Sequence, residues 1–518
     1  MKSIVKSFSR VSFFTLCSRI LGFARDIVIA GFFGTSSSLD AFFVAFRIPN
    51  LFRDIIGEGA ASSALVPVFS EYSVKHKKES YLSLILSIFI LLSIILVIIV
   101  ILGVLLAPFV VRVIAPGFIS SPDKLNLTIE ILKINFPYVF FIGLVALLMA
   151  FLNTEGVFSI SALSPCFLNI AMIFAIFLTF NRLHQPIFSL ALGVLAGGLL
   201  QFVMHIISSA KKFYDLSKGA DFKMIKIDIF HPAVNKIFKL IIPRIFGTIV
   251  YQLNVFMDTI LASLSWIVGE GAVSAVYYAN HLIQFPLGIF STAMMTAILP
   301  SLSKKIAQGQ AEEHRNTLIF SLKAIFFIMI PCLVALFILA HPVIQVLFQR
   351  GKFTSYSTNI TSFALMFFSL GLPFYASARI MASNFYSRQD TATPVKIAFL
   401  SLLLNLCLNL ILIWPLKVGG LALASAISSA FNFLMLHAAY KKTDTTLFTK
   451  NLQQFILKVC YASLVMGLFL YVFWRFVRFD IIVKLIFVII IGTAVYMLIT
   501  NLLGIKKINQ IIKWTLKN

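Results

Sequence analysis

Long apolar stretches without charge recur along the whole chain. Eight stretches of 20 or more residues hold no Asp, Glu, Lys or Arg: 81–111, 134–154, 156–181, 183–210, 324–349, 397–416, 418–440 and 485–505. A helix needs about 20 apolar residues to cross the hydrocarbon core of a bilayer. A transmembrane β-barrel would instead show short segments of alternating polarity. The pattern therefore predicts an all-α integral membrane protein.

Shorter or more polar apolar segments lie between these stretches and raise the predicted number of transmembrane helices to about fourteen. Charges, or several Pro and Gly residues, interrupt the first, second, seventh, eighth and tenth of the fourteen predicted spans. The predicted spans are 11–34, 40–70, 81–111, 127–152, 157–180, 186–210, 233–264, 271–301, 318–348, 356–386, 393–415, 418–440, 453–474 and 480–505.

Lysine and arginine residues gather in alternate connections between the spans. They crowd the start of the chain, the loop after the second span, the long loop at 211–232 and the last residues. Cytoplasmic loops of membrane proteins carry such an excess of Lys and Arg. We therefore expect both termini in the cytoplasm, which agrees with an even number of spans.

An internal repeat divides the chain into two similar halves. The segment SALVPVFS at 63–70 matches TAILPSLS at 296–303, and FPYVFF at 136–141 resembles LPFYAS at 372–377. The offset is about 235 residues, or six spans, so the halves share one orientation. Parallel repeats of this kind build transporters with a substrate site where the halves meet. The pattern predicts two six-helix lobes around a central cavity, plus two C-terminal helices. The expected parts are an N-terminal lobe at 1–212, a cytoplasmic linker at 213–232, a C-terminal lobe at 233–442, and two extra helices with a tail at 443–518.

The composition agrees with a membrane protein and narrows its partners. Hydrophobic residues make up 60% of the chain, charged residues 12%, and the net charge is +24. No basic run is interleaved with aromatic residues in a polar domain, so we expect no nucleic-acid partner. Basic loops that face anionic lipid account for the positive charge, which makes membrane lipids the expected partners.

Charged side chains inside the first two spans are the main candidates for function. The first span contains Arg19, Arg25 and Asp26, and the second contains Asp40 and Arg53. Such groups are costly in a membrane and face a partner or a wet cavity. Salt bridges between the two spans are one explanation, especially for the acids. Three arginines exceed what packing needs, and the planar guanidinium fork suits phosphate oxygens, which favours a ligand that carries pyrophosphate.

A second set of polar residues lies in later spans. Asp258 is in the seventh span, Asn405 and Asn409 share one face of the eleventh, and Ser425 is in the twelfth. Their oxygen atoms suit a hard monovalent cation. The alternative is hydrogen bonding between helices, the commoner role of Asn and Ser in membranes. Arg379 in the tenth span either pairs with Asp258 or faces the cavity, and the sequence leaves both alternatives open.

Enzyme signatures are missing from the sequence. It contains no GxxxxGK[ST] loop, no metal-ligand spacing of His and Cys, and no extramembrane stretch of enzyme size. We therefore expect no catalytic activity and no bound metal other than a sodium ion at the polar set just described.

Several motifs, in order along residues 1–440, resemble the MurJ/MviN family of lipid II flippases within the multidrug/oligosaccharidyl-lipid/polysaccharide exporter superfamily. They are SRILGFARD, DAFFVAFRIPNLFR, EGAASSALVPVFSEY, LPSLSK, FQRGKFT and YSRQDTATPVKIA. The resemblance implies a flippase of the bacterial inner membrane that moves undecaprenyl-diphosphate disaccharide pentapeptide (lipid II) to the periplasmic leaflet. It also implies alternating access driven by the membrane potential, a groove for the lipid tail at the two extra helices, and a monomer.

The resemblance also assigns roles to individual residues. It implies that Arg19, Arg25 and Arg53 bind the diphosphate and that Asp26 and Asp40 act as gates or ion-pair partners. The family often has an arginine in the eighth span, where this chain reads YYANHL, so His281 is a weaker expected anion contact. The family's sodium residues match Asp258, Asn405, Asn409, Leu421 (through its carbonyl) and Ser425. Asn409 replaces an Asp of the family, which removes one charge.

Other functions stay open from the sequence. A flippase for another polyprenyl-diphosphate oligosaccharide would use the same arginines. A membrane enzyme that handles polyprenyl phosphates would need an acidic metal motif or a catalytic base in a sizeable loop, and the loop at 211–232 is a poor match.

Overall fold

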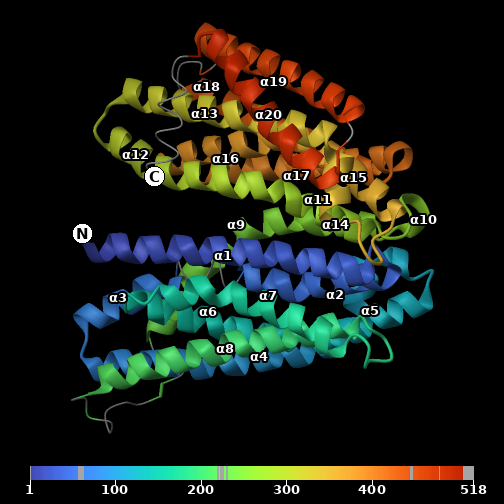
Figure 1. The fold of residues 1–518 in the computed structure, drawn as a ribbon. Helices are drawn as coiled ribbons and strands as arrows, with labels where there is room; N and C mark the ends of the chain where they lie inside the picture. The colour runs from blue at the N-terminus through green and yellow to red at the C-terminus, as the bar shows by residue number, and fades with distance from the viewer. Residues whose placement is uncertain are drawn as a thin grey trace. The chain divides into compact units, whose positions relative to one another are not determined.

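The computed structural model describes residues 2–55, 64–218, 221, 227–228, 232–443, 447, 449–477 and 479–505. Within these ranges the chain is almost entirely helical and contains no strand, which confirms the predicted all-α class (Figure 1). The helices are α1 Lys2–Phe33, α2 Ser37–Arg53, α3 Val66–Lys75, α4 Lys78–Ile114, η2 Pro116–Phe118, α5 Pro122–Asn135, α6 Tyr138–Thr154, α7 Ser159–Thr179, α8 Phe188–Ser217, α9 Pro232–Ala262, α10 Ser265–Val268, α11 Ala272–Pro286, η4 Leu287–Ser291, α12 Thr292–Ala307, α13 Ala311–Ile338, α14 Ala340–Phe348, α15 Ser355–Ser369, α16 Leu372–Ser387, α17 Ala392–Leu416, α18 Val418–Thr443, α19 Lys450–Phe476 and α20 Ile481–Leu502.

Most of these helices have the length and apolar character of membrane spans. Ten helical segments of the described chain are long and apolar enough to cross a membrane, and the bent pair of α15 and α16 makes eleven. They coincide with eleven of the fourteen predicted spans. The other three predictions correspond to α1, to α2 with α3, and to α9, which are helical but outside this set. These are the segments in which charges interrupt the apolar pattern.

Polar side chains cap several of the helices at their first turn. The Ser36 hydroxyl accepts a hydrogen bond from the Leu39 amide at the start of α2, and Thr354 does the same for α15. Asp480 accepts from two amides at the start of α20. Each cap satisfies amide groups that the helix itself leaves without a partner. The caps therefore fix where the apolar stretches begin as helices.

Breaks interrupt four of the predicted spans, and three of these breaks lie at proline or glycine. The predicted span at 127–152 divides into α5 and α6 at Phe136–Pro137, because proline provides no amide for the helix ladder. The span at 271–301 contains the π-helical turn η4 directly after Pro286. The span at 356–386 bends by 45° between α15 and α16, where Gly371 and Pro373 lie. The predicted span at 318–348 ends α13 at Ile338 and continues as α14.

The chain divides into two compact units, Met1–Leu264 and Ser265–Asn518. This grouping joins α9 to the first unit, whereas the sequence assigned residues 233–442 to the second lobe. Most of the predicted linker at 213–232 and the tail from 506 onward lie outside the described residues. The predicted lobe boundaries stay a prediction.

The first unit is built on α7, which packs against both α8 and α1. Helix α6 also packs on α8, α2 packs on α5, and α4 packs on α5 and α6. One hydrophobic cluster joins α3, α4, α6 and the start of α9 around Phe69, Tyr81 and Phe151. This packing places α1 against α7, and α2 against α5 and α6.

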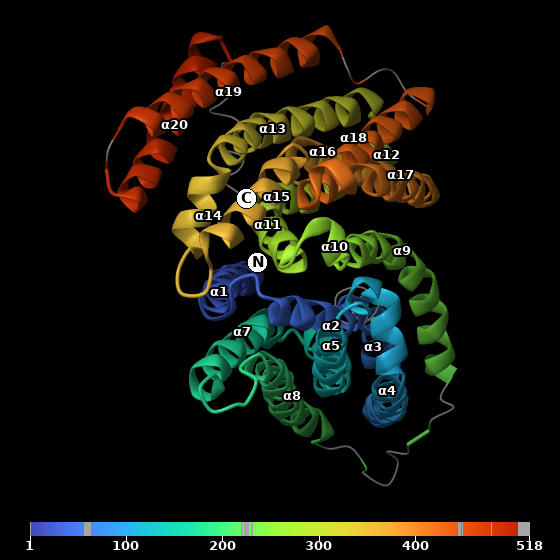
Figure 2. The same ribbon diagram turned by 90° about the vertical axis from the view of Figure 1, so that its right-hand side faces the viewer.

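The second unit is built on α18, which packs against α15, α16 and α17. Helix α13 lies between α16 and α19, and α20 packs on α19 (Figure 2). The two helices predicted beyond the repeat are therefore present as α19 and α20. They form a separate layer on the α13 side of this unit.

Candidate functional site

Arg25 is buried on α1 within a network of hydrogen bonds. Only 8% of its surface is exposed, and Asp26 beside it is also buried. Arg25 Nε and Nη2 donate to Asp26 Oδ1 at 3.0 and 2.7 Å, and Arg25 Nη1 donates to Asn169 Oδ1 at 3.0 Å. Asn169 on α7 in turn donates through Nδ2 to the Ser18 carbonyl at 3.3 Å. The guanidinium is therefore held in one orientation by two helices.

Arg53, the last residue of α2, repeats this arrangement with its own neighbour. Its Nε and Nη2 donate to Asp54 Oδ1 at 3.2 and 3.0 Å. Gln252 on α9 donates to the other oxygen, Asp54 Oδ2, at 3.2 Å. Arg53 and Asp54 are half-buried, so this pair is more accessible than Arg25 with Asp26. In both pairs the aspartate occupies the Nε edge of the guanidinium.

Tyr138 is a buried aromatic residue of the unit that contains Arg25 and Arg53. Its side chain is completely buried at the start of α6, and Arg53, Asp54 and Arg25 all lie within electrostatic range of its hydroxyl. The structure thus brings two of the three predicted diphosphate-binding arginines to one region of the first unit. A cluster of guanidinium groups with aligned N–H donors is a suitable site for phosphate oxygens.

Arg19, the third predicted arginine, lies two turns earlier on α1 and is exposed. Its guanidinium forms no hydrogen bond or ion pair within the part of the chain that the structure describes. Gly22 lies between Arg19 and Arg25 and faces α7, where a β-carbon would lie 3.4 Å from Asn169 Nδ2. This agrees with the expectation that Gly22 admits a neighbouring helix.

Asp40 is buried near the start of α2 and pairs with a lysine. Lys124 Nζ lies 3.2 Å from Asp40 Oδ2, and the same ammonium lies 4.1 Å above the centre of the Phe118 ring. The sequence predicted an ion-pair role for Asp40, and the structure identifies Lys124 on α5 as a partner. A buried charge of this kind requires such a partner because burial removes the hydration of the charge.

The residues of the predicted cation site are divided between the two units. Asp258 is buried on α9 in the first unit, and Asn405, Asn409, Leu421 and Ser425 are buried on α17 and α18 in the second. Asn409 Nδ2 donates to Asn405 Oδ1 at 2.8 Å, and Asn405 Nδ2 lies 3.4 Å from Ser425 Oγ.

The donor set of these residues fits a monovalent cation in part. The four residues on α17 and α18 offer neutral oxygen atoms, and Asn405 Oδ1 already accepts from Asn409. The hydrogen bonds between α17 and α18 match the alternative interpretation of these residues. The carboxylate of Asp258 is the one anionic group of the predicted set.

His281 and Arg379 lie on α11 and α16 of the second unit. His281 is exposed, and its ring lies edge-on to Tyr277 with 5.0 Å between the centroids. Arg379 is half-buried. Their roles as anion contacts stay predictions.

Two exposed or partly exposed carboxylates, Asp390 and Glu71, have a lowered pKa. A hydrogen bond from the Thr393 side chain lowers the pKa of Asp390, which also accepts from the Thr393 amide at 3.0 Å at the start of α17. A hydrogen bond from Lys236 on α9 lowers the pKa of Glu71 on α3. The ionised Asp390 therefore accepts hydrogen bonds at the start of α17, and the ionised Glu71 pairs with a lysine of another helix.

Sequence reasoning missed Asn169, Lys124, Tyr138 and Gln252. Asn169 is a polar amide inside an otherwise apolar span, which is a detectable signal. Lys124 lies just before the predicted span at 127–152, so the sequence pattern assigned it to a loop. Only packing between distant helices assigns these residues to the arginine and aspartate clusters.

Comparisons with known proteins identify the family of this chain. The sequence profile of the family described as "Lipid II flippase MurJ" matches residues 29–492. A protein of Buchnera aphidicola subsp. Acyrthosiphon pisum, named probable lipid II flippase MurJ, is 34% identical over 98% of this chain and 99% of its own length. A protein of Vibrio cholerae serotype O1 with the same name is 35% identical over 90% of this chain and 88% of its own.

Solved structures show the same relationship. A structure described as lipid II flippase MurJ in an inward closed conformation has a TM-score of 0.81 at 30% identity and covers 95% of this chain and 98% of its own. A multidrug resistance MATE family transporter of the MOP superfamily, in an inward-facing conformation, shares the fold, with a TM-score of 0.65 at 15% identity over 85% of this chain and 100% of its own. These matches over nearly the whole chain show that the protein belongs to the lipid II flippase MurJ family.

Proposed function

We propose that this chain moves lipid II from the cytoplasmic to the periplasmic leaflet of the bacterial inner membrane by alternating access. The observation that carries the proposal is the nearly full-length relationship to lipid II flippases, combined with the hydrogen-bonded guanidinium groups of Arg25 and Arg53 in the first unit. The chain acts as a monomer with both termini in the cytoplasm, and it changes no covalent bond of the lipid.

The arginines bind the diphosphate of the substrate in this mechanism. Asp26 and Asp54 each hold the Nε edge of one guanidinium, which fixes its plane before the ligand arrives. A guanidinium presents five donors in a rigid fork, so an oxyanion approaches through its other edges. Arg19 supplies a third, exposed cation close by on α1. Asp26 competes with the ligand for Arg25 and thereby acts as a gate. Asp40, which pairs with Lys124, is the second gating residue of the proposal.

The membrane potential drives the movement of charged groups in this proposal. A charge that crosses the whole membrane gains about 2.3 kcal/mol per 100 mV.

A sodium ion is the proposed cation of this mechanism. It would be held by Asp258, Asn405, Asn409, the Leu421 carbonyl and Ser425, and it would neutralise the carboxylate of Asp258. Sodium should then raise the unfolding temperature of the parent protein but not of Asp258→Ala. The absence of a sodium effect in the parent would remove the ion from the proposal.

The test of transport is to deplete the protein in cells without another flippase and to measure lipid II exposed at the periplasmic face. We expect exposed lipid II to fall and intact lipid II to accumulate inside. Replacement with Arg25→Ala or Arg53→Ala should not restore exposure, whereas the parent protein should. Lys396→Ala, at an exposed position at the start of α17, serves as the matched control.

Three outcomes would contradict the proposal. Full exposure of lipid II after depletion would exclude this substrate, and accumulation of a different polyprenyl-diphosphate oligosaccharide would identify the alternative flippase. A change in the mass of the lipid on incubation with the purified protein would indicate an enzyme. Full transport by both arginine variants at normal expression would leave the arginines with a structural role only.

A further inference from the structure

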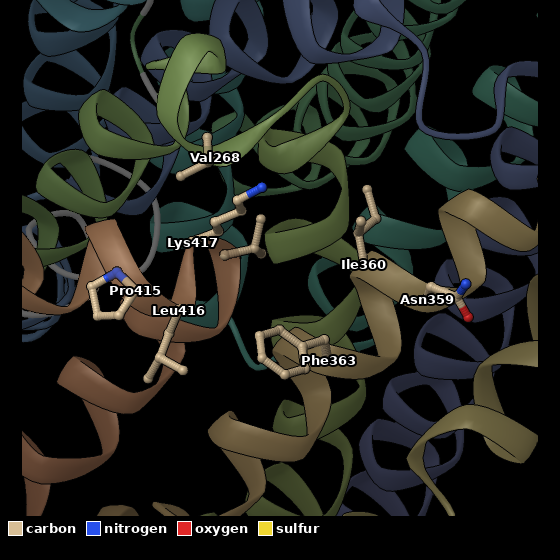
Figure 3. A pocket seen from close by; sticks show the side chains of 8 residues that line it. Val268, Asn359, Ile360, Phe363, Pro415, Leu416 and Lys417 are labelled. Carbon is tan, nitrogen blue, oxygen red and sulfur yellow. The ribbon is translucent and has the colours of Figure 1, made fainter.

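A pocket of about 410 Å³ lies at one end of the second unit, remote in sequence from the arginine cluster (Figure 3). Its walls come from the short helix α10, the first turns of α15, and the junction between α17 and α18. Apolar side chains such as Ile360, Phe363 and Leu416 form most of its surface. The Tyr356 hydroxyl donates to the Glu270 carbonyl at 3.0 Å, which ties the segment after α10 to α15.

Lys417 is the single charged residue among the described residues that line this pocket. It forms the one-residue joint between α17 and α18: its amide donates to the Ile413 carbonyl, and its carbonyl accepts from the Gly420 amide at 3.0 Å. Its φ of 50° is in the left-handed region, where a lysine is strained. Figure 3 shows its amine extending from the joint toward Val268 on α10.

The joint that carries Lys417 is also tightly packed. A β-carbon at Gly420 would lie 2.2 Å from the Leu412 carbonyl oxygen, so the first turn of α18 crosses the end of α17 at a distance that only glycine allows. A strained conformation persists when the surrounding structure enforces it. The backbone therefore holds the lysine at the pocket in one arrangement.

Two exposed tryptophans flank the pocket and indicate its depth in the membrane. Trp266 on α10 lies two residues before Val268 and is 61% exposed, and Trp414 lies directly before Pro415 and is 67% exposed. Tryptophan gathers at the interface between membrane and water, where its ring contacts lipid and its N–H contacts the headgroups. The pocket also lies at the ends of the spans α17 and α18 rather than at their centres. Both features place it at the headgroup level.

We propose that this pocket binds an anionic phospholipid, with the phosphate at Lys417 and the start of an acyl chain along Phe363, Ile360 and Leu416. The charge of the lining is complementary to an anionic headgroup, because a single ammonium is combined with apolar walls and no carboxylate side chain. Asn359 adds a donor: its Oδ1 pairs with His341 Nε2 at 3.2 Å, and its amide nitrogen has no hydrogen bond to the described part of the chain. A zwitterionic headgroup carries a positive group of its own, and repulsion between this group and the Lys417 ammonium would weaken its binding.

Tryptophan quenching by brominated lipids tests the proposal. The full-length chain with Trp474→Phe and Trp514→Phe retains, of its four tryptophans, only Trp266 and Trp414. It is placed in nanodiscs that contain either brominated phosphatidylglycerol or brominated phosphatidylcholine at low mole fraction. One lysine near a membrane surface should give about a fivefold preference for the anionic lipid. Lys417→Gln should remove this preference, whereas Lys417→Arg and the exposed control Lys396→Gln should keep it.

Each other outcome overturns the proposal. Equal quenching by the two lipids in the parent chain would overturn the proposal by itself, before any Lys417 variant is measured. An unchanged preference in Lys417→Gln would assign the effect to another cation, and loss of the preference in Lys396→Gln would assign it to net charge. Loss of the preference on addition of excess inorganic phosphate would show that the pocket takes a free phosphate group instead.

Discussion

Lys124 Nζ on α5 lies 3.2 Å from Asp40 Oδ2 on α2, and the side chains are only 7% and 2% exposed. The pair connects the start of α5 to the start of α2 inside the first unit. A buried ion pair gains little over an apolar pair of the same shape, but loss of one partner leaves a costly buried charge. The pair is therefore a structural restraint. Its effect on the free energy of unfolding becomes large only when one partner is removed and the other stays.

Removal of one partner should destabilise the protein more than removal of both. Asp40→Ala leaves the Lys124 ammonium buried and should cost about 3–5 kcal/mol in the free energy of unfolding, measured in detergent micelles. The double variant Asp40→Ala with Lys124→Met should cost less than the sum of the single changes. Lys133→Met, an exposed lysine on the same helix, should change stability by about 0.5 kcal/mol or less. Strict additivity of the two changes would contradict a direct interaction.

Asn169 should control the orientation of Arg25. Asn169→Ala removes the acceptor of Arg25 Nη1, and a hydrogen bond to a charged group is worth about 1.5–3 kcal/mol. If this energy is needed to aim the guanidinium, transport should fall by about 10- to 150-fold in the lipid II exposure assay. The matched control is Asn135→Ala, because the buried Asn135 amide has no hydrogen bond within the described chain. Similar transport by both variants would exclude a positioning role.

Asp390 should stabilise the start of α17 only while it is ionised. Its pKa is lowered in the folded state by the Thr393 hydrogen bond, so the stability it adds is present above the ordinary pKa of 3.8 and is lost as the pH falls below that value. At neutral pH, Asp390→Ala should lower the free energy of unfolding by about 1 kcal/mol, the usual value of a helix cap. Thermal unfolding of the parent and of Asp390→Asn across pH 3 to 7 checks the pH dependence. A difference between them that does not shrink at the acid end would be inconsistent with this cap.

Lys417→Gly should stabilise the protein although it removes a side chain. Backbone strain of this kind costs about 1–3 kcal/mol, which glycine would relieve. Glycine also lowers stability by about 0.4–1 kcal/mol, because it gives the unfolded chain more conformational freedom. The expected net gain is about 1 kcal/mol over Lys417→Ala, which keeps the strain. Denaturation of both variants in the same detergent makes the comparison. A glycine variant less stable than the alanine variant would show that the joint is relaxed.

The helices could be predicted from the sequence because the bilayer imposes their length. Stretches such as 81–111 and 485–505 have no polar alternative to a helix inside a membrane, so composition alone locates them. Two of the observed breaks coincide with proline, since Pro137 and Pro286 lie at them. The ends of the helices were less accurate, because α8 continues to Ser217 beyond the predicted residue 210.

The charged residues inside the first two spans were also visible in the sequence, and their cost in a membrane marked them as candidates. Their partners were not visible. Arg25 meets Asn169, which is 144 residues away, and Asp40 meets Lys124, which is 84 residues away. Neither spacing follows from helical periodicity, which relates only residues on one helix.

The sequence by itself therefore determined the helical class, the apolar spans and the identity of the buried charges, because each depends on the local balance between water and lipid. Only the tertiary structure decided that Asn169 orients Arg25, that Lys124 balances Asp40, and that Lys417 occupies a strained joint beside an apolar pocket. The physical reason is that hydrogen bonds and ion pairs depend on distances of about 3 Å. Such distances between remote segments arise only when whole helices pack together.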